Sequence, residues 1–206
     1  MSSDRAMHRS FRRLFDLAFA SVALTLAAPV IAVAAVAIRL ETRGPAFFRQ
    51  TRLGREGVPF DLHKLRGMYV DAERRWPETY AYAEQDPERP FHLARDPRVT
   101  RVGHVIRRLS IDELPNFWNV VRGDMSVVGP RPEIPELAHL YGDRLETFLS
   151  VKPGITSPAK ASGRDSLSFE QTLQAELDYI ANQSFRLDLE TIVRTAVNVV
   201  RGHDVV

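Results

Sequence analysis

An uncharged apolar stretch near the N-terminus, residues 17–38, constrains the fold of this chain more than any other feature. Its 22 residues are rich in Ala, Val and Leu. A helix needs about 20 such residues to cross the hydrocarbon core of a bilayer. A secretory signal peptide has the same order of basic and apolar residues, but its apolar region is only about 7–15 residues long. The sequence therefore predicts a retained N-terminal membrane segment.

Pro29 lies near the middle of this segment, where its ring and its missing N–H predict a kink or a break in the helix. Arginines flank the segment on both sides: Arg5, Arg9, Arg12 and Arg13 before it, and Arg39, Arg43, Arg49, Arg52 and Arg55 after it. The positive-inside bias would hold both flanks in the cytoplasm. A straight span leaves one basic flank outside, whereas a helical hairpin does not. We therefore expect a re-entrant membrane helix that is broken at Pro29.

The composition of the 206 residues narrows the class of protein. With 44% hydrophobic and 26% charged residues, the chain has enough apolar side chains for one folded domain beside the membrane segment. A net charge of +2 is only mildly basic, and no nucleic-acid-binding motif is present, so we expect no nucleic-acid partner. The absence of cysteine excludes a disulfide scaffold, a thiolate metal site and a cysteine nucleophile.

The remaining pattern predicts an α+β fold that is mainly helical. Residues 46–53 and 58–65 are expected to form a small β-hairpin around a glycine-bounded turn, and residues 125–128 a buried strand. Apolar residues at helical spacing predict helices over 99–109, 134–149, 168–182 and 185–201. We expect two parts: residues 1–43, the basic flank with the membrane helix, and residues 44–206, a folded domain.

Residues 96–132 combine adjacent carboxylates, several arginines and Gly/Pro punctuation. Ser110 and Glu113 have the spacing of a capping box, which predicts a helix N-terminus carrying Asp112 and Glu113 and a helix end at Gly123. Carboxylates in a first helical turn are usually capping residues only. The surrounding arginines also match what a diphosphate with a bound divalent cation requires. From the residues alone, both interpretations stay open.

These motifs resemble the bacterial sugar transferases, the small monotopic phosphoglycosyl transferases. The family pattern reads D-P-R-x-T-R-x-G, R-x-x-S-x-D-E-L-P, N-x-x-x-G-D-M-S-x-V-G-P-R-P and K-P-G-I-T. The chain carries all four motifs in this order between residues 96 and 156. Lys64-Leu-Arg-Gly-Met68 is similar to a further family motif, K-F-R-S-M. The resemblance extends from the apolar segment to residue 202.

The resemblance implies a reaction and a set of site residues. A sugar 1-phosphate would pass from a UDP-sugar to polyprenyl phosphate at the cytoplasmic face of the bacterial inner membrane, with release of UMP, as the first membrane-bound step of a surface glycan. The catalytic domain would face the cytoplasm. Asp112 would be the covalent nucleophile and Glu113 a ligand of Mg²⁺. The residues implied to neutralise phosphate charge are Lys64, Arg107, Arg131 and Arg164. Asp178 and Asp188 match acidic positions of the family, and either residue is equally readable as an ordinary helix-surface charge.

Two departures from the family pattern keep an alternative open. Residues 157–161 carry Pro158 and Lys160 where the family usually has a bulky residue and Gln, and Ala28 replaces the serine that commonly precedes the breaking proline. A membrane-anchored relative that binds phosphate or lipid without turnover is therefore a second hypothesis, against which the intact Asp112–Glu113 pair stands. A soluble phosphotransferase with an uncleaved signal is a third. The sequence leaves open the donor sugar, the glycan pathway and the oligomeric state, a homodimer included.

Overall fold

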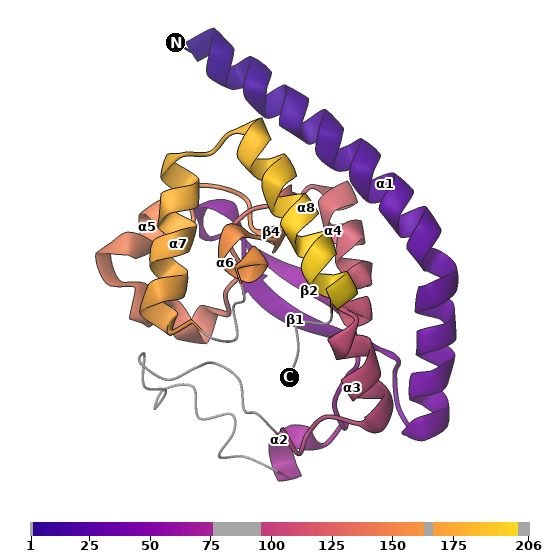
Figure 1. Ribbon diagram of the computed structural model, residues 1–206. Helices are drawn as coiled ribbons and strands as arrows, with labels where there is room; N and C mark the ends of the chain where they lie inside the picture. The colour runs from indigo at the N-terminus through magenta and orange to yellow at the C-terminus, as the bar shows by residue number, and fades with distance from the viewer. Residues whose placement is uncertain (1, 76–95, 163–166, 202–206) are drawn as a thin grey trace.

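The computed structural model describes residues 2–75, 96–162 and 167–201, and it has the predicted mainly helical α+β fold (Figure 1). A long helix, α1 (Ser2–Glu41), runs along one side of the molecule. The described remainder packs beside it as short helices around two small two-stranded sheets.

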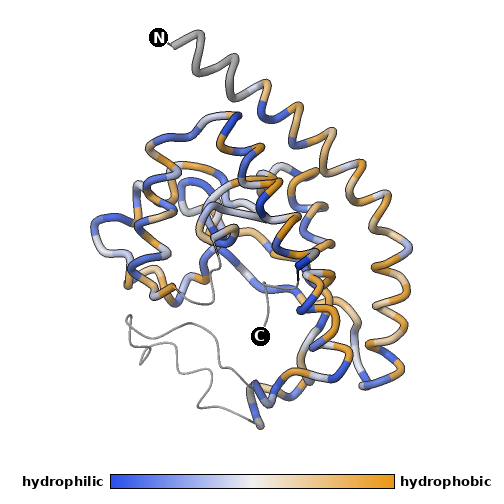
Figure 2. The backbone as a smooth tube through the Cα atoms, in the orientation of Figure 1, coloured by the Kyte–Doolittle hydropathy of each residue, from blue (hydrophilic) through white to orange (hydrophobic). Residues whose placement is uncertain are grey.

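Helix α1 is the apolar element of the chain, as the hydropathy colouring of Figure 2 shows. Within the described residues, Ser10–Glu41 is the one helix that is long and apolar enough to cross a membrane, judged by length and composition. Small side chains on one face contact the rest of the protein, and they include Ala20, Ala27 and Ala34. Large apolar side chains project from the other faces: Leu14, Val22, Leu26, Val30, Val33, Val36 and Leu40.

Helix α1 continues through Pro29, so the predicted break is absent. The helix axis is curved instead, and the chain does not turn back on itself (Figure 1). Proline removes the N–H that would bond the carbonyl four residues earlier, here that of Thr25, and its ring crowds the same carbonyl. Both Thr25 and Pro29 are exposed, so they lie on the outer, convex side of the helix, and curving around the protein opens this side and relieves the clash without ending the helix (Figure 1).

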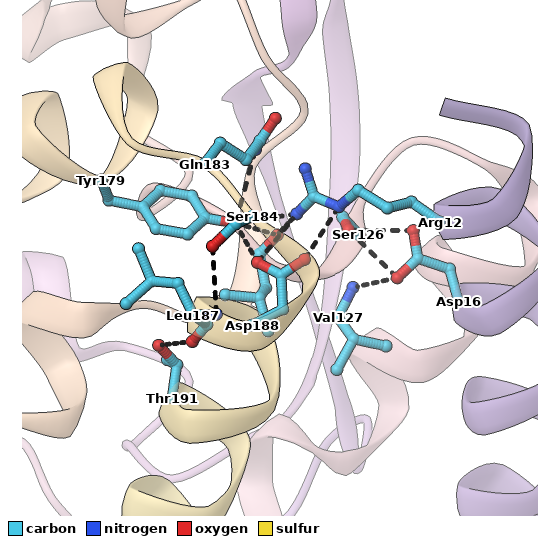
Figure 3. A network of polar contacts seen from close by, with 11 residues as sticks. Arg12, Asp16, Ser126, Val127, Tyr179, Gln183, Ser184, Leu187, Asp188 and Thr191 are labelled. Atoms are coloured by element: carbon cyan, nitrogen blue, oxygen red, sulfur yellow. Dashed lines mark hydrogen bonds and ion pairs between the residues drawn. The ribbon is translucent and has the colours of Figure 1, made fainter. Parts of the chain in front are cut away.

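The N-terminal part of α1 is held by a buried polar network (Figure 3). The Arg12 guanidinium forms an ion pair with Asp188 at 2.9 Å and donates to the Tyr179 hydroxyl at 2.7 Å, while that hydroxyl donates to Asp188 at 2.7 Å. One turn further on, the Asp16 carboxylate accepts the backbone N–H of Val127 at 2.9 Å. These contacts tie α1 to the C-terminal helices and to a central strand.

The C-terminal end of α1 is tied to the same body of protein. The Glu41 carboxylate accepts the backbone N–H groups of Arg101 and Val102 at 2.8 and 3.0 Å, at the first turn of α3 (Arg101–Arg108). Arg66 donates to the Thr42 hydroxyl at 2.9 Å just after the helix. Both ends of the apolar helix are therefore docked on one domain.

The predicted hairpin is confirmed. Strands β1 (Phe47–Leu53) and β2 (Pro59–Leu65) pair antiparallel from Phe47 opposite Leu65 to Leu53 opposite Pro59, around a short 3₁₀ turn, η1 (Arg55–Gly57). A buried amide anchors β2 to the next layer: Asn119, on α4 (Phe117–Arg122), donates to the Asp61 carbonyl at 2.7 Å. Helix α2 (Ala72–Arg75) follows the hairpin.

The predicted capping box is wrong. Ser110 has a left-handed backbone (φ 52°), and its side chain caps nothing. The next residues form a 3₁₀ helix, η4 (Ile111–Asn116), that leads into α4. In an α-helix starting at Ser110, the ring of Pro115 would crowd the Ile111 carbonyl four residues earlier and leave this carbonyl without its N–H partner, which disfavours an α-helix there. Gly123 ends α4 in the left-handed region (φ 97°), as predicted.

The predicted buried strand is also present: β3 (Ser126–Val128) pairs in parallel with β4 (Gly154–Thr156). Directly after β3, a Cβ on Gly129 would lie 2.4 Å from the Lys152 carbonyl oxygen, so only glycine fits there. The G-P-R-P and K-P-G-I-T motifs thus meet because their glycines allow two backbones to touch.

The helix predicted over 134–149 is divided in two. Gly142 (φ 52°) interrupts the 3₁₀ segment η5 (Pro135–Arg144), and α5 (Leu145–Phe148) follows. After the short helix α6 (Pro158–Ala161), the two predicted C-terminal helices are confirmed as α7 (Phe169–Ala181) and α8 (Phe185–Arg201). Ser168 closes a true capping box with Gln171 at the start of α7.

Candidate active site

The carboxylate pair lies on the 3₁₀ helix η4, whose backbone follows the left-handed turn at Ser110. Glu113 is held between two ammonium groups. Lys64, from β2, donates to one of its oxygens at 2.9 Å, and Lys160, from α6, donates to the other. The side chain of Glu113 is 19% exposed, and those of Lys64 and Lys160 are 22% and 15% exposed, so solvent screens these pairs only partly.

The environment pushes the two carboxyl pKa values apart. Burial raises the pKa of Asp112, opposed by the ammonium of Lys64 and reinforced by the charge of Glu113. Burial also acts on Glu113, but the ammonium groups of Lys160 and Lys64 outweigh it and hold the pKa of Glu113 well below its usual range. Adjacent carboxyl groups with opposite shifts are typical of sites in which the two groups have different tasks.

A pocket opens beside Glu113, and its walls are strongly cationic. Four basic side chains line it against one carboxylate, which suits a ligand with at least two negative charges. The complete lining comprises Arg52, Leu62, Lys64, Glu113, Asn116, Met125, Arg131, Pro132, Gly154, Ile155, Thr156, Ser157 and Lys160. Neither Asp112 nor Arg107 belongs to this lining.

Arg107 lies behind the carboxylates, at the C-terminal end of α3. Its charge acts on Asp112, and its buried Nη1 has no hydrogen-bond partner among the described residues. A buried guanidinium nitrogen without a partner costs free energy unless a ligand satisfies it. Arg107 is therefore suited to contact an anion held next to Asp112.

The D-P-R-x-T-R-x-G motif builds the scaffold rather than the pocket. The Asp96 carboxylate receives a two-pronged contact from Arg98, closest at 2.6 Å, and Thr100 caps α3 by accepting the Gly103 N–H at 2.9 Å. A Cβ on Gly103 would lie 1.9 Å from the Gly67 carbonyl oxygen, so this glycine lets α3 pack directly on the end of β2. The motif thereby places Arg107 behind the site.

Arg131 lines the pocket and belongs to a restricted segment of backbone. Glu133, which follows it, accepts the Tyr141 hydroxyl at 2.9 Å and the Ile134 N–H at 2.8 Å, and it is 7% exposed. Proline on both sides of Arg131 restricts the backbone further. The backbone that carries the Arg131 guanidinium into the pocket lining is thus restricted.

Comparison with known proteins agrees with this geometry. The model of the family described as bacterial sugar transferase matches residues 7–202. The chain belongs to this family. It is 38% identical over 192 residues to the UDP-glucose:undecaprenyl-phosphate glucose-1-phosphate transferase of Caulobacter vibrioides, covering 89% of this chain and 67% of that protein.

Other members of the sugar transferase family differ in length. Over 198 residues the chain is 36% identical to the exopolysaccharide production protein ExoY of Rhizobium meliloti, covering 93% of this chain and 87% of that one. It is 35% identical over 200 residues to the UDP-galactose-lipid carrier transferase of Erwinia amylovora, covering 95% of this chain but only 42% of the relative. The chain therefore spans less than half of some of the sugar transferases that it matches.

The remaining predicted residues of the family pattern lie apart from the pocket or outside the described residues. Asp188 belongs to the buried network with Arg12, and Asp178 is on α7, where it accepts the Gln174 amide at 2.8 Å. Neither lines the pocket. Arg164 lies outside the described residues.

Sequence reasoning missed two residues that line this sugar transferase pocket, and a third that is buried next to the pocket residues Ser157 and Arg131. In the sequence, Lys160 stands out only as a departure from the family pattern. Asn116, one turn after Glu113, lines the pocket with a buried Oδ1 that has no hydrogen-bond partner within residues 2–75, 96–162 and 167–201. Glu176 is 1% exposed on the apolar face of α7, where a glutamate between Leu173 and Ile180 was a detectable signal.

Mg²⁺ fits this site on one condition. The ion usually takes one or two carboxylates and completes its shell with phosphate oxygens and water. Glu113 and the free Oδ1 of Asn116 supply suitable oxygen atoms on one 3₁₀ helix. The described residues contain no cluster of three or more His, Asp or Glu side chains that would hold a metal. The residues thus fit a Mg²⁺ that is shared with substrate phosphates.

Glu176 should make the stability of the fold depend on pH. Neither of its oxygens has a hydrogen-bond partner of good geometry in the part of the chain that the structure describes, and burial raises its pKa to about 7, although Ser157 and Arg131 oppose the rise. Its contribution to stability is complete below pH 4.5, the ordinary pKa, and is lost as the pH rises through about 7. Glu176→Gln should therefore raise the free energy of unfolding at pH 8 by about 3 kcal/mol, since one pKa unit is worth about 1.4 kcal/mol.

Denaturant unfolding in detergent at pH 4.5 and pH 8 measures this effect. The gain should be small at the lower pH, where Glu176 is protonated in the folded state and about half protonated in the unfolded one. Glu146→Gln, at an exposed position on α5, is the matched control and should change stability little at either pH. Equal unfolding free energies of Glu176→Gln and the unchanged protein at pH 8 would contradict the assignment.

Proposed function

We propose that this protein transfers a sugar 1-phosphate from a UDP-sugar to polyprenyl phosphate at the cytoplasmic face of the membrane, releasing UMP and starting a surface glycan. One observation carries the proposal: basic side chains from separate elements, Lys64, Arg131 and Lys160, line the same pocket as Glu113, the residue that follows Asp112. A diphosphate has the charge that this pocket requires. Membership of the sugar transferase family and the names of the matched relatives support the same reaction.

Asp112 is the nucleophile in the proposed first step. One of its carboxylate oxygens attacks the phosphorus that carries the sugar, and the bond from that phosphorus to the bridging oxygen of the diphosphate breaks. UMP leaves with the bonding electrons, and the sugar phosphate stays on Asp112 as an acyl phosphate. A covalent step divides one difficult displacement into two easier ones.

The second step restores the carboxylate. An oxygen of polyprenyl phosphate attacks the same phosphorus, the acyl phosphate bond breaks, and Asp112 is released as the polyprenyl diphosphate sugar forms. Throughout, Lys64, Arg107 and Arg131 neutralise charge on the phosphate oxygens. Arg164 is assigned the same role through the family pattern alone. Mg²⁺ bound with Glu113 would add positive charge at the phosphate oxygens when the donor is present.

The nucleotide product tests the proposal. The purified 206-residue chain in detergent is incubated with polyprenyl phosphate, Mg²⁺ and a panel of UDP-sugars, and the released nucleotides are separated by chromatography. We expect UMP from at least one donor. UDP as the main product would mean cleavage of the sugar–oxygen bond and would refute phosphoglycosyl transfer. No nucleotide release from any donor, with retained binding of UDP, would favour the inactive membrane-anchored relative.

A further inference from the structure

Lys160 lies on the short helix α6, which is fixed by local contacts. Ser157 caps helix α6 by accepting the Lys160 backbone N–H at 3.2 Å, and Pro158 occupies the first helical position, where proline is preorganised. Ala159 is fully buried, and the Ala161 carbonyl accepts the Asn198 amide at 2.8 Å. The residues in which this chain departs from the family pattern therefore form an ordered support under one lysine.

The Lys160 ammonium occupies the side of Glu113 that Lys64 leaves free. Lys64 pairs with Oε1 and Lys160 with Oε2, so each carboxylate oxygen has its own cation. Lys160 also donates to the Ile155 carbonyl at 3.3 Å. A divalent cation bound to Glu113 would lie next to one or both ammonium groups, and neighbouring like charges repel each other.

Substrate phosphate changes this balance. Lys160 lines the same pocket as Arg131 and is only 15% exposed, so a diphosphate in the pocket offers its ammonium a second anionic partner. When the Lys160 ammonium binds a substrate phosphate, it releases Oε2 of Glu113, and this oxygen can then bind a divalent cation. A divalent cation that competes with the Lys160 ammonium for Glu113 should therefore bind weakly without substrate and more tightly when the diphosphate is present.

We propose that Lys160 binds substrate phosphate and, while the pocket lacks substrate, forms an ion pair with Glu113. As a result, this protein binds a divalent cation poorly until a nucleoside diphosphate is present. The proposal rests on the proposed function, because it assigns a further specificity-determining residue to the same site. It differs from that function in its observable, which is the affinity for metal and for nucleotide rather than turnover.

Metal binding to Lys160→Gln tests the proposal directly. Mn²⁺, which replaces Mg²⁺ and gives an electron paramagnetic resonance signal when free, is titrated into the full chain in detergent without nucleotide. Removing a neighbouring like charge should tighten Mn²⁺ binding about tenfold or more. In the presence of EDTA the same variant should bind UDP about tenfold more weakly, since a phosphate contact is lost. Lys160→Arg, which keeps the charge, should retain weak Mn²⁺ binding.

The chain offers a matched control, because Lys64, Lys152 and Lys160 are its only lysines. Lys152 does not line the pocket, and Lys152→Gln should leave both affinities unchanged. Unchanged or weaker Mn²⁺ binding by Lys160→Gln would overturn the proposal, even if UMP release is normal. Tighter Mn²⁺ binding together with UDP as the reaction product would instead uphold it and refute the proposed reaction.

Discussion

Asp112→Asn should abolish sugar-phosphate transfer and the covalent adduct on the protein, because an amide does not attack phosphorus. We expect UMP release to fall at least about 10³-fold, the order of loss seen when a nucleophile is removed. Binding of the UDP-sugar should change much less, since Lys64, Arg131 and Lys160 remain around the pocket. Intact-mass analysis after incubation with the UDP-sugar alone detects the adduct before the acceptor can remove it.

The control for this experiment is another Asp→Asn change. Asp143 is exposed next to the Gly142 bend and lines no part of the pocket, so Asp143→Asn should form the adduct normally. A sugar-phosphate adduct that survives in Asp112→Asn would sink the assignment of the nucleophile. If the same sugar-phosphate adduct were found on another carboxylate, that residue would be the nucleophile.

Local patterns predicted most of the regular structure. The hairpin followed from two apolar runs around a glycine-bounded turn, and α8 from a stripe at helical spacing, because in both cases neighbours in sequence settle the conformation. The capping box failed for a local reason that the sequence already contained. Pro115 removes an N–H that an α-helix from Ser110 needs, and this outweighs the favourable Ser110–Glu113 spacing.

The site was only partly predictable, because its contacts join distant segments. Glu113 meets Lys160 across 47 residues, and no periodicity or spacing encodes such a contact. The family pattern identified Lys64 and Arg131, which do line the pocket, since motif residues can be transferred one by one. A residue that departs from the pattern, as Lys160 does, carries no such prior and needs the folded structure.

The contacts of α1 bear on its orientation in the membrane. Arg12 and Glu41 are about 44 Å apart along a helix with a rise of about 1.5 Å per residue, more than the hydrocarbon thickness of about 30 Å. Both nevertheless contact the same domain, and Ala27 is buried against it between them. A straight span would draw polar protein surface into the hydrocarbon, where unpaired polar groups are costly. We therefore expect both ends of α1 on the cytoplasmic side.

Thiol labelling of the cysteine-free chain tests this expectation. Ser3→Cys and Arg43→Cys place one thiol on each side of the apolar segment. Arg43 is chosen because it is exposed, whereas a cysteine at the preceding Thr42 would remove the hydrogen bond that Thr42 accepts from Arg66. A membrane-impermeant maleimide added to intact cells should label neither variant, and both should react once the cells are opened. Labelling of Ser3→Cys alone in intact cells would mean a helix that truly spans the membrane.

Pro29→Leu should shift the protein toward that spanning form. Leucine restores the N–H that can bond the Thr25 carbonyl and removes the ring that bends the helix, so the 22 uncharged residues become a straighter and more apolar segment. In a spanning helix Arg12 can no longer reach Asp188 from the cytoplasmic side, and breaking a buried ion pair of this kind costs about 3–5 kcal/mol. We expect Ser3→Cys to become labelled in intact cells in the Pro29→Leu background, with a matching loss of UMP release.

The control is Val30→Leu, an apolar change at the neighbouring exposed position, which should leave Ser3→Cys protected. If Ser3→Cys stays protected in the Pro29→Leu background as well, docking to the domain, and not the proline, holds α1 in place.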